Sequence, residues 1–503
     1  MSKDNFIKNS LILSISNSTM GILRFIFSII LSKDLGPEGM GLFSLIMPIF
    51  DLFCCLVCGG LIAAISKEGA VYFDKKDYKS LNNSIKVTML FDFVWALFIA
   101  IAVFLLAPFI STYIIKDPRA LYSIEIICPA LVFIALSSII KGYFYGISHV
   151  TIPAIIDIFE KAIRISIVVG LIGFIHSKNI TNTVTLVYIA LSVGEFASFI
   201  LLYIYYRVYK RKYSSGPIVA ERKSQLLFNI LIVSIPLCLN GFLSTALSAM
   251  STLIIPLRLV VSGFSHSEAL SMIGRFTGMA LTITLFPIMI VTSMSVVLVP
   301  DISQSLSKKD FYGLQNRIDG VLRFSVLVGV ATLIICLCIP KELGMLFFNR
   351  SDLGDYIKFS AVSAPFVYAS VTSFSILSGL GKQKAILRVS LITSVEELIL
   401  LYILAAIPSI NIYSFGISLT ITCITTLILN LKEIKDSCYI SIPFSKLAID
   451  VLISILTYLI ISILNISLTS QSGNLKIIFL LVSSFILFFG LAYYSNKKIN
   501  YFG

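Results

Sequence analysis

Long apolar stretches alternate with short polar segments along the whole chain. A helix that crosses a bilayer needs roughly 20 mostly apolar residues, and fourteen stretches satisfy this requirement. The polar segments between them are too short to hold a separate soluble domain. The predicted spans are 9–31, 42–65, 88–113, 121–145, 152–175, 184–206, 227–255, 272–299, 320–340, 357–379, 386–407, 411–430, 447–466 and 475–495.

The composition supports a membrane protein and excludes other classes. Apolar residues make up 57% of the 503 residues, and charged residues only 13%, against roughly 25% in a soluble domain. So few charges cannot cover a globular surface, and so much apolar surface is incompatible with a disordered chain. The sequence therefore predicts an all-α polytopic membrane protein with 14 transmembrane helices.

The basic residues predict the orientation of the chain. Lysine and arginine concentrate in alternate polar segments, most of all at 66–86 and 207–223. Because cytoplasmic loops are enriched in these residues, we expect a multi-pass protein of the cell membrane with both termini in the cytoplasm. The same bias explains much of the net charge of +13, so the charge indicates anionic lipids rather than nucleic acid.

An internal repeat relates the two halves of the chain. Three pairs of segments match in the same order: 39–48 with 278–287, 75–85 with 308–318, and 129–146 with 365–381. Each half then holds six helices, so both halves cross the membrane in the same orientation, as in transporters with parallel repeats. The predicted parts are an N-lobe at 1–206, a cytoplasmic basic linker at 207–225, a C-lobe at 226–431, and two further helices with a cytoplasmic tail at 432–503.

Several short motifs resemble those of the stage V sporulation protein B family. They are Gly36-Pro-Glu-Gly-Met-Gly-Leu-Phe43, Lys141-Gly-Tyr-Phe-Tyr-Gly146, Leu298-Val-Pro-Asp-Ile-Ser303 and Leu380-Gly-Lys382. That family belongs to the polysaccharide biosynthesis branch of the multidrug/oligosaccharidyl-lipid/polysaccharide (MOP) exporter superfamily and is similar to lipid II flippases. The resemblance implies a MATE-like fold with a cavity between two lobes, alternating access, and transport of lipid-linked precursors for the cell wall or spore cortex.

Charged side chains inside the predicted spans are the candidate site residues, because a charge within the bilayer costs several kcal/mol. The span at 152–175 carries four of them, and their spacing of three and four residues places them on one helix face. We expect the pairs Asp157–Lys161 and Glu160–Arg164, with Glu195 of the next helix joining them. Such a stripe is either a paired structural element or a cavity wall that handles substrate or a coupling ion.

Other acidic residues are candidates for ion coupling. Glu396 and Glu397 occupy the helix that the repeat makes equivalent to 152–175, with no nearby base in the same span. Adjacent residues point about 100° apart on a helix, so only one of the two faces a given spot. That residue either binds a proton or Na⁺ or pairs with a cation on another helix. Asp51, Asp92 and Glu125 are further single acids. Asp51 is a candidate residue of the substrate cavity, because it follows Pro48 in mid-helix, where a kink frees backbone groups.

Three arginines lie toward the predicted outer ends of helices: Arg24, Arg258 and Arg275. The planar guanidinium suits phosphate, so Arg24 and Arg275 join the candidate substrate residues for a pyrophosphate-linked cargo. The alternative is that these long side chains simply extend to the membrane interface.

The leading hypothesis is a flippase or exporter of a lipid-linked oligosaccharide or peptidoglycan precursor. The alternative is a cation- or proton-coupled multidrug antiporter of the same superfamily. No enzyme activity, metal site or cofactor is expected, apart from Na⁺ or a proton as coupling ion, because neither a catalytic constellation nor a histidine cluster occurs in the sequence. The expected partners are the lipid-linked glycan, membrane lipids and cell-wall synthesis or sporulation proteins, and we expect a monomer.

Overall fold

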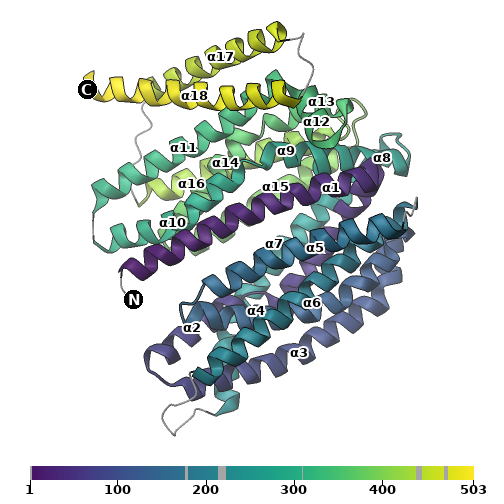
Figure 1. Ribbon diagram of the computed structural model, residues 1–503, viewed down its shortest axis with the longest axis vertical. Helices are drawn as coiled ribbons and strands as arrows, with labels where there is room; N and C mark the ends of the chain where they lie inside the picture. Colours follow the sequence, from purple (N-terminus) through teal and green to yellow (C-terminus); the bar gives the residue numbers. More distant parts are fainter. Residues whose placement is uncertain are drawn as a thin grey trace. The chain divides into compact units, whose positions relative to one another are not determined.

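The computed structural model describes residues 3–175, 179–212, 222–308, 310–437, 444–468 and 474–502 (Figure 1). All regular elements within these ranges are helical. The chain divides into two compact units. Unit 1 comprises Met1–Ile30 and Asp34–Ile254, and unit 2 comprises Leu31–Lys33 and Ile255–Gly503. The lobe boundaries drawn from the repeat stay a prediction, and part of the predicted linker, 213–221, lies outside the described residues.

Unit 1 is built from long helices with two sharp breaks near its start. Gly36 (φ 63°) kinks the first helix between the predicted spans 9–31 and 42–65. Gly60 (φ 74°) then separates that helix from the second, so the predicted span 42–65 is interrupted near its end. Both positions need the left-handed backbone that glycine adopts without a steric penalty. The helices are α1 (Lys3–Cys58), α2 (Leu61–Asp74), α3 (Tyr78–Phe109), η1 (Ile110–Ile115), η2 (Pro118–Ala120), α4 (Leu121–Gly146), α5 (Thr151–Ile175), α6 (Ile180–Lys212) and α7 (Lys223–Val261), whose last residues belong to unit 2.

Unit 2 contains more interrupted helices than unit 1. The predicted span 272–299 is divided by a π-helical segment and by Pro287, and the predicted span 357–379 bends by 49° between two helices. The helices are α8 (His266–Ile273), η3 (Gly274–Ala280), α9 (Leu281–Leu285), α10 (Ile288–Ser307), α11 (Phe311–Cys338), α12 (Pro340–Phe348), η4 (Ser351–Leu353), α13 (Gly354–Ala361), α14 (Ala364–Gly379), α15 (Gln383–Leu404), α16 (Tyr413–Lys435), α17 (Phe444–Ser467) and α18 (Asn474–Phe502).

The helical fold predicted from the sequence is confirmed. Within the described ranges, 9 helical stretches are long and apolar enough to cross a membrane, or up to 10 if the bent pair counts as one span. All fourteen predicted spans fall on helical segments. The total of fourteen crossings is compatible with this structure and stays a prediction.

Matching positions of the internal repeat make matching local structures in the two units. Asp77 caps α3 by accepting a hydrogen bond from the backbone N–H of Ser80 at 3.0 Å, and Asp310 caps α11 through Gly313 at 2.9 Å. The two capping residues have nearly the same backbone angles, with φ −83° in both and ψ 70° and 75°. Such a cap satisfies helix N–H groups that otherwise lack a partner, which explains why the aspartate is present in both halves.

Two glycines mark a second repeated contact. A Cβ atom on Gly142 of α4 would lie 2.9 Å from Cβ of Ile65 in α2, and one on Gly379 of α14 would lie 2.9 Å from Cβ of Ile302 in α10. Small residues let helices in a membrane approach closely, where dispersion contacts replace the hydrophobic effect as the source of stability. The two units therefore use the same close helix contact.

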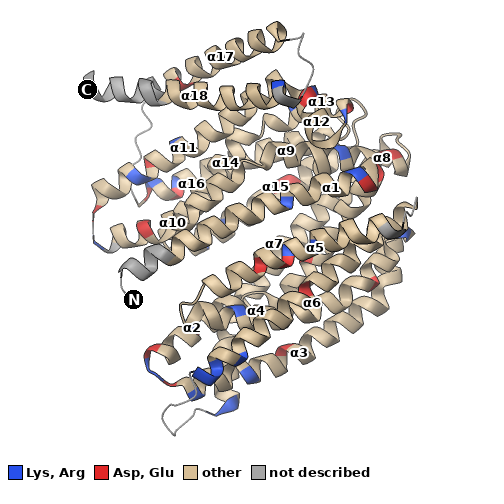
Figure 2. Cartoon of the chain, viewed as in Figure 1, with Lys and Arg blue, Asp and Glu red and all other residues tan. Residues whose placement is uncertain are grey.

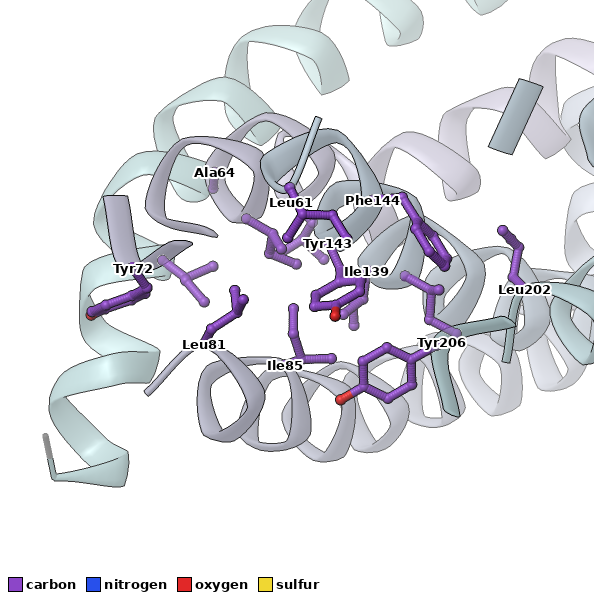
Figure 3. Close-up of a cluster of buried hydrophobic side chains, with 14 of the residues drawn as sticks. Leu61, Ala64, Tyr72, Leu81, Ile85, Ile139, Tyr143, Phe144, Leu202 and Tyr206 are labelled. Carbon is purple, nitrogen blue, oxygen red and sulfur yellow. The ribbon is translucent and has the colours of Figure 1, made fainter. Parts of the chain in front are cut away.

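The core of unit 1 holds the helices around the candidate site in place (Figure 3). Buried side chains of α2, α3, α4 and α6 meet there, with the rings of Tyr143 and Tyr206 edge to face at 5.0 Å between centroids. The opposite face of α3 exposes Leu90, Phe98 and Leu105, as expected for a surface against lipid. α3 therefore buries one face and presents the other to the bilayer.

Candidate functional site

A network of six charged side chains on α4, α5 and α6 is the main candidate site (Figure 2). All six belong to unit 1, and the three cations balance the three carboxylates. Most of the surrounding helix surface is apolar, which makes the cluster conspicuous. The members are Lys141 of α4, Asp157, Glu160, Lys161 and Arg164 of α5, and Glu195 of α6.

Arg164 is the centre of the network. Its Nη2 donates to Glu160 Oε1 at 2.5 Å and to Glu195 Oε1 at 3.0 Å. These side chains are largely buried, with exposed fractions of 11% for Arg164, 4% for Glu160 and 15% for Glu195. The predicted Glu160–Arg164 pair and the participation of Glu195 are both confirmed. Because removing one member of a buried pair leaves an uncompensated charge, each member depends on the others.

The predicted Asp157–Lys161 pair is wrong. Asp157 binds Lys141 of the neighbouring helix α4, with 2.6 Å between Oδ1 and Nζ, and Lys161 binds Glu160, with 2.6 Å between Nζ and Oε2. Lys141 lies near the end of the predicted span 121–145, so its position along the chain does not separate it from the basic residues of the loops. In the structure it is a partly buried member of the site.

Gly194 of α6 makes room for the network. A Cβ atom there would lie 2.9 Å from Glu160 Oε1 and 3.6 Å from Cβ of Arg164. A larger residue would displace the carboxylate that binds both Lys161 and Arg164. Gly194 precedes Glu195 directly, so one short segment of α6 supplies both the space and an acid.

Arg24 and Asp51 lie on the two sides of the α1 kink, and both side chains are exposed. They interact electrostatically with each other. The Cys54 thiol interacts electrostatically with both Asp51 and Glu195.

In unit 2, the glutamates of α15 have a different environment. Thr425 of α16 donates to Glu396 Oε1 at 3.0 Å, while Glu396 Oε2 is buried without a hydrogen-bond partner. Within the described part of the chain, neither Glu396 nor Glu397 forms an ion pair. The structure thus turns Glu396, rather than Glu397, toward a polar group of α16.

The two arginines of unit 2 that the sequence singled out, Arg258 and Arg275, occupy separate places. Arg275 of the π-helical segment η3 forms a salt bridge with Asp352 at 3.3 Å, and Arg350 binds the same carboxylate at 2.8 Å. Hydrogen bonds to Asp352 raise the pKa of Arg350 above its usual value. Arg258 donates to the Tyr402 carbonyl at 2.8 Å and lies 4.1 Å over the ring of that tyrosine, which holds it at a fixed position.

The described residues contain no group of three or more His, Cys, Asp or Glu side chains arranged to hold a metal ion. His176 and Cys438 lie outside those residues. Ion pairs and single carboxyls within apolar helices are, in a membrane protein, the usual signs of a transport pathway.

Comparison with known proteins agrees with this class. The chain matches the family described as "Polysaccharide biosynthesis protein" over residues 6–306 and the family MatE over residues 236–403. It therefore belongs to the polysaccharide biosynthesis protein family, a branch of the MOP superfamily of membrane transporters. This confirms the family resemblance and the MATE-like fold that the sequence motifs implied.

Two curated relatives come from Bacillus subtilis (strain 168). Stage V sporulation protein B is 25% identical over 456 residues, covering 89% of this chain and 87% of the relative. Lipid II flippase MurJ is 22% identical over 403 residues, covering 75% of this chain and 73% of the relative. Both relatives are thus similar over most of their length.

Solved structures share the fold at lower identity. An inward closed lipid II flippase MurJ has a TM-score of 0.72 and 14% identity, covering 98% of this chain and 99% of that chain. An inward-facing multidrug resistance MATE family transporter has a TM-score of 0.65 and 12% identity, covering 85% of this chain and 98% of that chain. Both matches support the fold, and neither identifies a substrate.

Proposed function

We propose that this protein is a flippase or exporter that moves a lipid-linked oligosaccharide or peptidoglycan precursor across the cell membrane by alternating access. The observation that carries the proposal is the balanced charged network of unit 1. Lys141, Lys161 and Arg164 are cations that carboxylates already hold within the membrane. An anionic headgroup, such as a pyrophosphate, can replace those carboxylates as their partner without leaving an isolated charge.

The names of the relatives point in the same direction. One is a sporulation protein and another is a lipid II flippase, so we propose a role in cell-wall or spore cortex synthesis. Arg24 and Arg275 are further cations for the headgroup in this proposal. Both termini lie in the cytoplasm, the protein acts as a monomer, and cell-wall synthesis or sporulation proteins are its partners.

In this proposal, Glu396 binds the coupling ion. A buried carboxyl that has only a hydroxyl partner gains most from binding a proton or Na⁺, because no cation of the described residues neutralises it. Glu397 is the second candidate on the same helix. Ion binding at α15 would then supply free energy for the transport cycle.

A multidrug antiporter is the second candidate function. The match to the MatE family favours an antiporter. It covers residues 236–403, which extend from within α7 into α15. An antiporter of cationic drugs would use the carboxylates as the substrate contacts instead of the lysines and arginines. The two functions therefore assign opposite members of the network to the cargo.

Precursor translocation in cells depleted of their own lipid II flippase tests the proposal. The amount of precursor that becomes accessible at the outer face is measured while this protein is expressed, beside Arg24→Ala and Glu160→Ala variants. We expect the wild type to restore access and both variants to lose it, whereas Lys358→Ala, in an exposed pair with Asp355, serves as the matched control. No restoration by wild type that is present in the membrane contradicts a peptidoglycan precursor as cargo, and drug efflux by the same cells would favour the antiporter.

A further inference from the structure

Asp92 of α3 is a buried acid outside the charged network. Its exposed fraction is 1%, and its Oδ2 atom has no hydrogen-bond partner. It forms no ion pair within the described residues. Thr88, one turn earlier on the same face of α3, is also fully buried, and its hydroxyl has no partner. Leaving an ionised carboxylate in such a place costs far more than leaving a neutral one.

The end of α1 lies next to Asp92. Trp95, one turn later on α3, donates its Nε1–H to the Leu56 carbonyl at 3.3 Å. Asp92 itself interacts electrostatically with Cys58, the last residue of α1. The C-terminus of a helix carries partial negative charge, so it disfavours a carboxylate and favours the neutral acid.

The titratable groups around Asp92 do not neutralise it. Two thiols interact with it electrostatically, Cys58 of α1 and Cys238 of α7. Lys141 of α4 interacts with Cys58 but forms its salt bridge with Asp157 at 2.6 Å. A cation for Asp92 is thus missing from the helices described around it, while two weak acids interact with it.

α7 closes this place by packing on the α1–α2 break. A Cβ atom on Gly60 would lie 2.6 Å from Cβ of Leu237, and one on Gly59 would lie 3.0 Å from Cα of Cys238. The Cys238 thiol donates to the Cys55 carbonyl at 3.4 Å. Only glycine at these positions lets the α7 backbone approach so closely, and the contact covers part of the end of α1.

We propose that Asp92 is a proton-binding site that is neutral while α7 packs on the α1–α2 break. When that contact opens, water reaches the carboxyl, which gives its proton to the water and becomes a carboxylate. Closing the contact requires the proton to return. The link to the transport cycle rests on the proposed function, whereas the protonation of Asp92 does not.

Infrared difference spectroscopy of the full-length protein in lipid membranes tests the site directly. We expect a carboxylic-acid C=O stretching band at neutral and mildly alkaline pH that disappears in Asp92→Asn and shifts in Asp92→Glu. The matched control is Asp450→Asn, because Asp450 is bound by Arg323 at 2.8 Å and should contribute no such band. If the wild type and Asp92→Asn have the same carboxylic-acid bands, or Asp92→Glu leaves the band in place, the proposal is wrong.

Translocation at varied pH separates this site from the proposed function. We expect Asp92→Asn, which resembles the neutral acid, to weaken the pH dependence that the wild type shows. A pH dependence that is the same in both proteins would contradict proton release from Asp92 during transport. If the wild type itself shows no translocation, the proposed function is contradicted. The infrared result on Asp92 is not affected by that outcome.

Discussion

The α5–α6 pair of unit 1 and the α15–α16 pair of unit 2 hold equivalent places in the internal repeat, yet they treat buried charge differently. On α5, Arg164 binds Glu160 and Glu195, so the charges neutralise one another. On α15, Glu396 has only the Thr425 hydroxyl. One helix pair thus forms a balanced network, suited to exchanging partners with a charged cargo. The other keeps an isolated carboxyl, suited to binding a small cation.

The largest effect is expected from breaking the network at its centre. Arg164→Ala leaves Glu160 and Glu195 without their shared cation, and the loss of one partner from a buried pair lowers the free energy of unfolding by about 3–5 kcal/mol. Thermal unfolding of the purified protein measures this change.

The matched control is Lys358→Ala, which removes an exposed pair with Asp355 at 3.8 Å and should change the free energy of unfolding by about 0–1 kcal/mol. Equal effects of the two substitutions would mean that the network contributes no more than a surface pair.

A smaller effect is expected from filling the space beside the network. In Gly194→Ala the new methyl group would lie 2.9 Å from Glu160 Oε1, so the carboxylate must shift, at a cost of about 1–3 kcal/mol in the free energy of unfolding. Gly170→Ala on α5 is the control, because nothing lies within 4 Å of its Cβ position. A Gly194→Ala protein as stable as the wild type would show that the network tolerates displacement of Glu160.

The smallest effect on stability is expected from a substitution in the α15–α16 pair. Glu396→Gln keeps an acceptor for Thr425 and removes an unneutralised charge, so the free energy of unfolding should change by no more than about 1 kcal/mol. Translocation should nevertheless lose its dependence on pH or Na⁺, measured with each gradient imposed separately. Unchanged ion dependence would remove Glu396 from the coupling site and leave Glu397 as the candidate on α15.

The sequence predicted the helices better than it predicted the site. Apolar length located the spans, and spacing along one helix was enough for the Glu160–Arg164 pair, because both residues lie on one face of α5. The Lys141–Asp157 pair depends on how α4 packs against α5. The spacing of residues along a single helix does not reveal that packing. The break at Gly60 was missed for a related reason, since a glycine in an apolar stretch has no fixed backbone conformation until its neighbours pack. The break at Gly36, in contrast, lies in the polar segment between two predicted spans.

The candidate ion site shows the same limit. Periodicity established that Glu396 and Glu397 cannot both face one spot, but it could not choose between them. The choice depends on Thr425, which lies 29 residues away on α16. The Asp77 and Asp310 caps, in contrast, depend only on residues nearby in the chain. They lie within the segments 75–85 and 308–318, which the sequence alone matched as a repeat.

The most direct test of the central claim exchanges the charges of one network pair. The double variant Lys141→Asp, Asp157→Lys retains an ion pair at the place where the two side chains lie 2.6 Å apart, but it moves the cation from α4 to α5. Translocation of lipid-linked precursor is measured at equal amounts of folded protein in the membrane. We predict wild-type stability with most of the translocation lost, because the headgroup needs its cations at fixed positions. Wild-type translocation by the exchanged pair would contradict the account, since the network would then serve only to hold the helices together.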